Sequence, residues 1–192
     1  MWKYVLPGVN TTVYEAALWF LIYSVLGWVV ESIYMSICNR KLTNRGYIRG
    51  PICPIYGFGG IFVHVMLNGL ADNIPYLFIT GSILATTLEF LTAKAMIKIF
   101  DCVWWDYSNK PFNYKGIICL ESSAAWGLYT IIEVLVLKKM VFMFIYKIPV
   151  RYGRLVVAFA SVYYLLAFIL RTYRAKKGEI QYEENNIMQY KF

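Results

Sequence analysis

The sequence predicts an all-α membrane protein, a polytopic bundle of about five spanning helices. The 192 residues are 59% hydrophobic and only 16% charged, with a mean hydropathy of +0.52. A soluble domain of this size needs a more polar surface, whereas a bilayer solvates apolar side chains directly. The apolar residues gather in segments of spanning length. Two of these segments also resemble each other, and each has a carboxylate within an otherwise apolar helix.

Five apolar segments are long enough, or nearly long enough, to cross a bilayer. We expect the spans at residues 14–37, within 51–71, and at 76–99, 117–137 and 155–170. The first reaches roughly 36 Å as a helix, too long for a short targeting segment. The fifth reaches roughly 24 Å and crosses fully only if it includes residues 150–153. Residues 140–148 are apolar but too short to cross, so we expect them in the interface or packed on the bundle.

The second segment is irregular where it begins. Two prolines and three glycines fall within ten residues, namely Pro51, Pro54, Gly57, Gly59 and Gly60. Such a sequence does not give a uniformly stiff helix. Irregular backbone is tolerated in lipid only where protein or a wet cavity satisfies its polar groups. We therefore expect a helix opening at Pro54 or a partly re-entrant loop, buried in the bundle. Close packing through glycine faces is the alternative.

The two similar segments suggest an internal duplication of a two-helix unit. The first reads Phe20-x3-Ser24-x-Leu26-x4-Glu31 and continues, after a polar loop, with Arg49-Gly50-Pro51-Ile52-Cys53. The second reads Phe78-x3-Ser82-x-Leu84-x4-Glu89 and continues with Lys115-Gly116-Ile117-Ile118-Cys119. The parallel repeat units would be about 14–71 and 76–137, with the working site between them. The alternative is chance, since short patterns recur easily in apolar sequence.

Basic residues indicate the orientation. The first loop holds four without an acidic residue among them, and four more follow the last span: Arg40, Lys41, Arg45 and Arg49, then Arg171, Arg174, Lys176 and Lys177. The loop around Asp72 has no Lys or Arg. The positive-inside bias places the N-terminus outside and the C-terminus in the cytoplasm. We expect one transmembrane domain, residues 1–170, and a cytoplasmic tail, 171–192. The partners are then membrane lipids, not nucleic acid.

Glu31 and Glu89 are the first candidates for chemistry, because an ionisable group within a span is costly and marks a functional site by default. We place both near the cytoplasmic ends of their helices, at similar depth. They could face each other across a pseudo-two-fold axis and form a proton or cation site. Alternatively, each forms an ion pair with a loop arginine, Arg45 or Arg49, and fastens the bundle together.

Further candidates lie in the loops. Tyr56 begins the second span, and Asp106 and Asn113 lie between the third and fourth spans. Trp104 and Tyr107 are typical interface anchors. Asp106 and Asn113 either order the loop as turn residues or reach a substrate, and turns are the commoner outcome. Glu121, with Ser122 and Ser123, lies one turn into the fourth span and could continue the polar lining. Alternatively, Glu121 interacts with the helix N-terminus.

The sequence favours neither a metal site nor a cofactor. The four cysteines, Cys38, Cys53, Cys102 and Cys119, lie at the predicted cytoplasmic ends of spans and include no C-x-x-C pair. Packing roles are favoured over disulfides or a soft metal site. The single histidine, His64, is expected to be hydrogen-bonded within the bundle. The sequence has no Walker P-loop, G-x-S-x-G elbow or H-E-x-x-H helix, so we assign no catalytic residue.

Three motifs together resemble a known family of bacterial membrane proteins. They are the run from Leu26 to Ser32, the loop from Asn44 to Gly57, and Trp105-Asp106-Tyr107-Ser108. They are similar to the CmpB-like permeases of the ABC-transporter type IV family, over roughly residues 18–127. The resemblance implies a multi-pass protein of the cytoplasmic membrane that acts as a transporter permease, with a separate ATPase. It implies no mechanism or site residues.

The leading hypothesis is therefore a permease component with a polar site at the cytoplasmic side of the bundle. The candidate residues for transport or binding are Glu31, Arg45, Arg49, Tyr56, Glu89, Asp106 and Asn113. Five thin spans enclose little space, so we expect a homo-oligomer or partner membrane chains. One alternative is a membrane-embedded enzyme acting on a lipid or lipid-linked headgroup, with Asp106 or Glu31 as general base. The other is a structural or assembly subunit.

Overall fold

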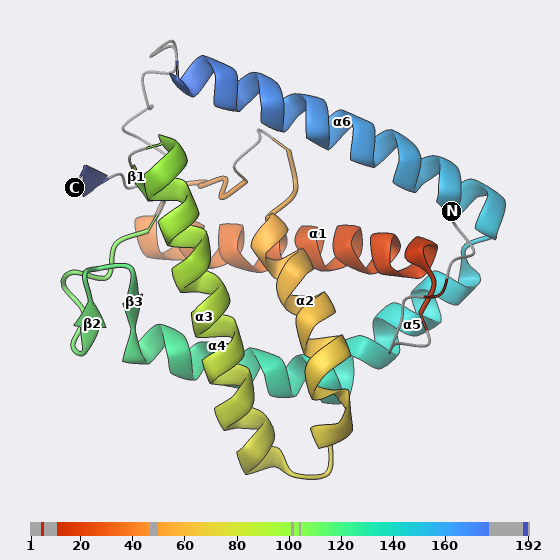
Figure 1. Cartoon of the computed structure of the whole chain (residues 1–192), viewed down its shortest axis with the longest axis horizontal. Helices are drawn as coiled ribbons and strands as arrows, with labels where there is room; N and C mark the ends of the chain where they lie inside the picture. Colours follow the sequence, from red (N-terminus) through yellow and green to blue (C-terminus); the bar gives the residue numbers. More distant parts are fainter. Residues whose placement is uncertain are drawn as a thin grey trace.

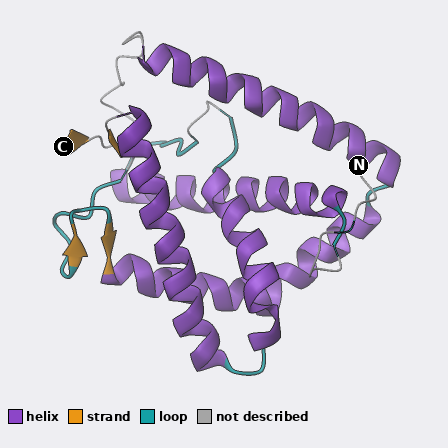
Figure 2. Ribbon diagram, viewed as in Figure 1, coloured by secondary structure: helices purple, strands orange, loops and turns teal. Residues whose placement is uncertain are grey.

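The computed structural model describes residues 5, 11–46, 50–100, 102, 103, 105–176, 190 and 191. Helices make up most of it, which confirms the predicted all-α class (Figure 2). The helices are α1 Val13–Asn39, α2 Pro54–Leu67, the 3-10 turn η1 Asn68–Leu70, α3 Ile74–Phe100, α4 Leu120–Ile132, the π-helical turn η2 Glu133–Leu137, α5 Lys138–Lys147 and α6 Val150–Lys176. The strands are β1 Cys102–Val103, β2 Asn113–Tyr114, β3 Ile118–Cys119 and β4 Tyr190–Lys191.

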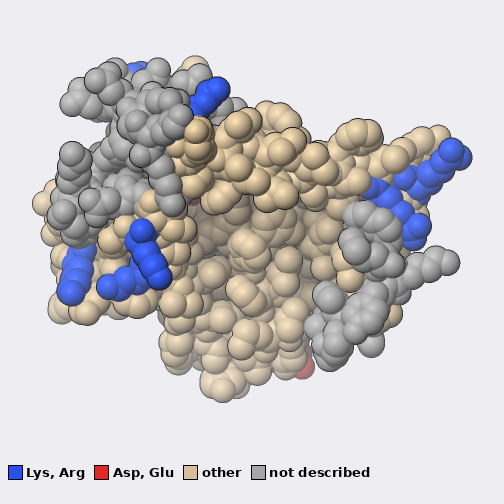
Figure 3. Space-filling model, turned by 45° about the horizontal axis from the view of Figure 1, so that its top comes forward, with Lys and Arg blue, Asp and Glu red and all other residues tan. Residues whose placement is uncertain are grey.

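Three of the described helices, α1, α3 and α6, are long and apolar enough to cross a membrane. They correspond to the first, third and fifth expected spans. α6 begins at Val150 and has 27 residues, so it includes the segment that the fifth span needed to cross fully. At most 28% of the most apolar stretch of each helix is buried, so their outer faces are available to lipid. The face drawn in Figure 3 has Lys and Arg gathered at two ends, with uncharged surface between them.

The other two expected spans form shorter or segmented helices. α2 starts at Pro54, with the proline in the first turn where its missing N–H costs nothing. With η1 it reaches roughly 25 Å, less than a bilayer core. α4, η2 and α5 follow one another without a break. The helix starts at Leu120 rather than Ile117, because Ile118 and Cys119 pair with the β2 strand.

The bundle consists of two tightly packed helix pairs, α1 with α2 and α3 with α4 (Figure 1). A glycine allows the close approach in each pair. A Cβ atom on Gly57 of α2 would lie 2.7 Å from the Phe20 ring of α1, and closer still to Ser24. A Cβ atom on Gly127 of α4 would lie 2.7 Å from the ring of Phe78 in α3, and closer still to Ser82. The same residue types thus contact each other in both pairs.

Residues 140–148 pack on the bundle, one of the two expected outcomes. Val141 and Ile145 of α5 are buried against α1 and α6. Two further clusters complete the core, one between α2, α3 and η2 and one where α3 meets the loop after it. α6 runs along one side of the two pairs and makes a few contacts with α1 and α3 (Figure 1).

Candidate functional site

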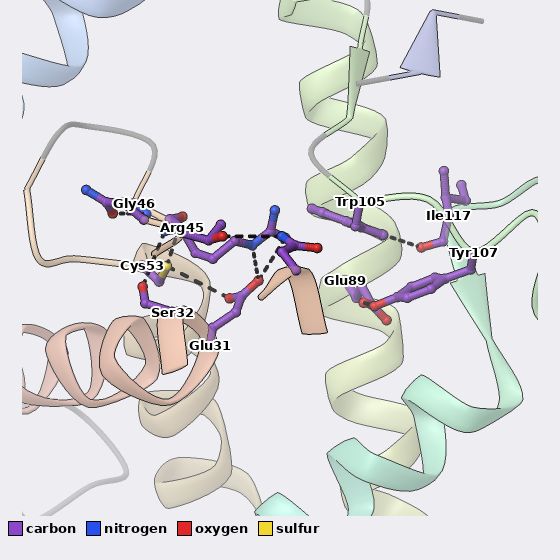
Figure 4. A network of polar contacts seen from close by, with 12 residues as sticks. Glu31, Ser32, Arg45, Gly46, Cys53, Glu89, Trp105, Tyr107 and Ile117 are labelled. Carbon is purple, nitrogen blue, oxygen red and sulfur yellow. Dashed lines mark hydrogen bonds and ion pairs between the residues drawn. The ribbon is translucent and has the colours of Figure 1, made fainter. Parts of the chain in front are cut away.

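Glu31 forms an ion pair with a loop residue. Nε and Nη2 of Arg45 both lie 2.9 Å from Oε1 of Glu31 (Figure 4). The Arg45 side chain is only 8% exposed and that of Glu31 is 24% exposed, so the pair is largely shielded from solvent. The Cys53 sulfur lies 3.9 Å from Oε2 of Glu31 and 3.4 Å from the Arg45 carbonyl oxygen. The loop between α1 and α2 is therefore fastened at Glu31.

Glu89 is buried and bound by neutral donors. Its Oε1 accepts a hydrogen bond from the Tyr107 hydroxyl at 3.0 Å. Its Oε2 accepts from Ser122 Oγ at 2.7 Å and from Trp126 Nε1 at 3.2 Å. None of these donors is cationic, and the described residues provide no ion pair for Glu89. Among the described residues, the Glu89 carboxylate is therefore solvated by neutral dipoles alone.

One cavity of about 430 Å³ joins the two glutamates. Glu31, Arg45 and Tyr56 line it from the first helix pair and its loop, and Glu89 and Trp126 line it from the second pair. The rings of Tyr56 and Trp126 contact each other, with centroids 5.3 Å apart. The rest of the wall is mostly apolar and includes Met96, Ile99 and Phe168 of α6. Four predicted site residues thus lie in one cavity.

The charges around the cavity do not balance. Among the described lining residues the charged groups are Glu31, Glu89 and Arg45, so two negative charges and one positive charge leave a net charge of −1. Because Arg45 forms its ion pair with Glu31, Glu89 is the carboxylate for which the described residues supply no counter-charge. A low-dielectric cavity with an uncompensated carboxylate and aromatic faces favours a monovalent cation or a proton.

The other predicted site residues lie elsewhere. Asp106 accepts hydrogen bonds from the backbone N and the side chain of Ser108, so it orders a turn. Asn113 donates to the carbonyl oxygens of Ser108 and Lys110, which also makes it a turn residue. Neither lines the cavity. Arg49 and the Trp104 anchor are outside the described residues.

Glu121 and His64 also have partners outside the cavity. Both carboxylate oxygens of Glu121 accept from Lys110, at 3.0 and 2.9 Å, and the pair is exposed. His64 packs against Trp19, with ring centroids 3.9 Å apart, and its Nε2 is 3.5 Å from the Thr11 hydroxyl. No cluster of metal-ligating side chains occurs within the described part of the chain.

Three residues bind Glu89: Tyr107, Ser122 and Trp126. Ser122 was expected only as part of a polar lining with Glu121, and the other two were not predicted as site residues. Trp126 precedes Gly127 as Tyr56 precedes Gly57, and this likeness could have identified it. Tyr107 was interpreted as an interface anchor, yet its hydroxyl points to Glu89 (Figure 4). Burial, followed by the Glu89 carboxylate, raises the pKa of Tyr107, so the hydroxyl remains protonated and donates.

The thiol beside Glu31 is also kept protonated. Cys53 precedes α2 and is buried. Burial is the largest cause that raises its pKa to about 12, and the Glu31 carboxylate adds to the effect, while Arg45 opposes it. Since the thiolate is the nucleophilic form, Cys53 is unsuited to covalent chemistry at neutral pH.

Comparison with known proteins gives one match. Residues 18–172 match the family described as "Putative ABC-transporter type IV". This region covers α1, from Leu18 on, through most of α6 and includes all the residues that line the cavity. No curated protein and no solved structure matches the chain.

Proposed function

Because the chain belongs to this ABC-transporter type IV family, we propose that it is the permease component of a transporter and that the 430 Å³ cavity is its solute site. One observation supports the site above all. The cavity lies between the two helix pairs and holds a carboxylate from each. Transporter sites typically lie where two structural repeats meet.

The chemistry of the cavity favours a small organic monovalent cation as the solute. Glu89 supplies the uncompensated negative charge, and the faces of Tyr56 and Trp126 add cation–π attraction. The apolar wall would accommodate the alkyl part of an amine. Arg45 is held in its ion pair, so an anionic solute would find little free positive charge there.

We place the cavity at the cytoplasmic side of the membrane, with the N-terminus outside. The basic loop that follows α1, with Arg40 and Lys41, also supplies Arg45 to the cavity, and basic loops favour the cytoplasmic side. Because the sequence has no Walker motif, a separate ATPase would supply the energy. Oligomerisation and partner membrane chains are part of the same proposal.

Charge-neutral variants test the solute site. We expect Glu89→Gln to reduce the uptake of organic cations, with tetraethylammonium and methylammonium as probes, at least tenfold at unchanged abundance. Glu121→Gln removes the same charge from the exposed pair with Lys110 and should leave uptake unchanged. Uptake of both probes at the wild-type rate by Glu89→Gln would contradict the proposal. A loss of protein instead of uptake would favour the structural-subunit alternative. The enzyme alternative has less support, because Asp106 lies in a turn away from the cavity.

A further inference from the structure

Glu133 is a second buried carboxylate, outside the cavity described above. It begins the π-helical turn η2 and is 6% exposed. Its Oε1 accepts a hydrogen bond from the Tyr23 hydroxyl of α1 at 2.9 Å. Its Oε2 is buried and has no hydrogen-bond partner among the described residues. π-Helical turns often occur at functional sites.

A cavity of about 130 Å³ lies beside Glu133. It adjoins the larger cavity, because four residues line both: Ile55, Tyr56, Leu88 and Trp126. The Tyr56 and Trp126 rings, in contact with each other, therefore stand between the two spaces. The three carboxylates, Glu31, Glu89 and Glu133, border two adjoining cavities that run into the bundle.

The size and lining of the smaller cavity restrict what can occupy it. It has about a third of the larger cavity's volume, so a solute that fills the larger one does not fit. A metal cation would need several oxygen ligands. The oxygen-bearing side chains around the space are those of Glu133, Tyr23, Tyr56, Tyr129 and Thr130. The Tyr23 hydroxyl is already directed at Glu133, and Thr130 donates to the Trp126 carbonyl oxygen. The space is almost wholly apolar, so a proton on Glu133, with at most a water or two held at its Oε2 and the nearby hydroxyls, fits better.

Protonation also resolves the cost of burying Glu133. An ionised carboxylate with an unpartnered oxygen is expensive in an apolar cavity, and one added proton removes the charge. Lys138 of α5 acts on Glu133 through space and donates its hydrogen bond to Asn68. Tyr23 donates to Glu133, and Tyr56 and Tyr129 line the same cavity. The proton would arrive from water on Oε2 and return to water from the same atom.

We propose that Glu133 is a proton-binding site that exchanges protons with the larger cavity past the Tyr56–Trp126 pair. The inference rests on the proposed function, to which it adds a proton route beside the solute site. The competing interpretation is that Glu133 serves only to fasten α1 to η2 through Tyr23. In that case its protonation state is fixed and has no connection to the cavity.

Infrared difference spectroscopy of the full chain in lipid nanodiscs tests the site without any solute. The acid-minus-alkaline spectrum should contain a protonated-carboxyl band that shifts in D₂O and is lost in Glu133→Gln. The amide introduced by this substitution still offers an oxygen to Tyr23, so the variant should fold. Glu121→Gln is the matched control and should keep the band. An unchanged carboxyl region in Glu133→Gln would overturn the proposal.

A second variant tests the route. Gly59 lines only the smaller cavity, and a Cβ there would meet only Leu88, at 3.8 Å. The added Cβ meets only ordinary contact, so the Gly59→Leu side chain should extend into the space and slow the band's response to a pH jump at least tenfold. Gly69→Leu, where no atom lies within 4 Å of the added Cβ, should respond like the wild type. An unslowed response in Gly59→Leu would overturn the route. Because no solute is present, failure here is distinguishable from failure of the solute site, which only uptake measures.

Discussion

Replacing Glu89 by alanine removes the acceptor of three hydrogen bonds at once. The donors are Tyr107, Ser122 and Trp126, at 3.0, 2.7 and 3.2 Å. Leaving a buried donor without an acceptor costs about 1–3 kcal/mol. Because Tyr107, Ser122 and Trp126 are only partly buried, the low end of this range applies to each, which predicts a loss of about 3 kcal/mol in Glu89→Ala. For a protein of this size, that corresponds to a fall in Tm of at least about 6 °C.

Glu89→Gln should behave differently, because an amide can satisfy all three partners. Its oxygen at the Oε2 position accepts from Ser122 and Trp126. Its NH₂ group at the Oε1 position donates to the Tyr107 oxygen, since a hydroxyl also accepts. We therefore expect Glu89→Gln to unfold within about 2 °C of the wild type or above it, because a buried charge is also removed.

Thermal unfolding of the purified protein in nanodiscs, followed by tryptophan fluorescence, measures both variants. Glu121→Ala is the control, because an exposed ion pair contributes at most about 1 kcal/mol. If Glu89→Ala and Glu89→Gln lowered Tm equally, the charge of Glu89 and not its role as an acceptor would stabilise the fold. The hydrogen-bond reasoning would then be refuted.

Three further predictions concern the first helix pair and its loop. Gly57→Ala should lower Tm by several degrees. Overpacking the contact costs about 1–3 kcal/mol, whereas the better helix propensity of alanine returns only about 1 kcal/mol. Gly69→Ala is the control and should not lower Tm, because nothing lies within 4 Å of the added Cβ. The maleimide labelling rate of Cys53, followed by mass spectrometry, should rise about tenfold per pH unit from pH 7 to 10. The reason is that a pKa of about 12 keeps the reactive thiolate scarce over this whole range. A labelling rate that levels off near pH 9 would contradict this. Arg45→Ala should destabilise the fold, and adding Glu31→Gln should restore part of the lost stability. A double-mutant cycle of unfolding should give a coupling energy of about 0.5–3 kcal/mol between the two residues. Additive effects would show that the ion pair contributes nothing to stability.

The membrane class and the carboxylates in the site could be predicted because both follow from the cost of burying charge. An apolar helix containing Glu31 or Glu89 must place that side chain against protein or a cavity, and the sequence shows this directly. Tyr56 could be predicted as a site residue because it lies at the irregular start of the second span. The structure brings these three residues to one cavity.

Glu133 was missed although the same rule applies to it. It lies in the apolar run between Thr130 and Lys138, within the fourth expected span. Glu133 has no acidic counterpart in the first unit, so the likeness between the two segments does not point to it. Its partner Tyr23 is 110 residues away in the chain, and no local pattern could reveal that contact.

Asp106 and Asn113 had two alternatives, of which a role in a turn was named as the commoner. Both are polar residues beside aromatic anchors, and sequence alone could not decide between a turn and a substrate contact. The structure has both bonded to backbone groups within five residues. Short polar side chains compete for nearby backbone groups, so local turns are their commonest role in loops.

The internal duplication stays a prediction, and the packing of the two helix pairs supports it. Gly57 contacts Phe20 and Ser24 as Gly127 contacts Phe78 and Ser82. One turn further along, Gly60 of α2 faces the Tyr23 ring. In the second pair the sizes are reversed, since Thr130 of α4 faces Gly81. In both pairs a larger residue faces a glycine, but the glycine belongs to the second helix of the first pair and to the first helix of the second pair. Two sequences that diverged from one pair would be expected to change in this compensating way.

The asymmetry of the site comes from the loops and not from the helices. The loop after α1 supplies Arg45, which neutralises Glu31. The loop after α3 supplies Tyr107, which donates to Glu89 but leaves its charge in place. Two similar glutamates thereby differ in what they can bind. Of these two glutamates, Glu89 is the one without a counter-charge among the described residues, and this makes it the residue on which we expect a cationic solute to depend.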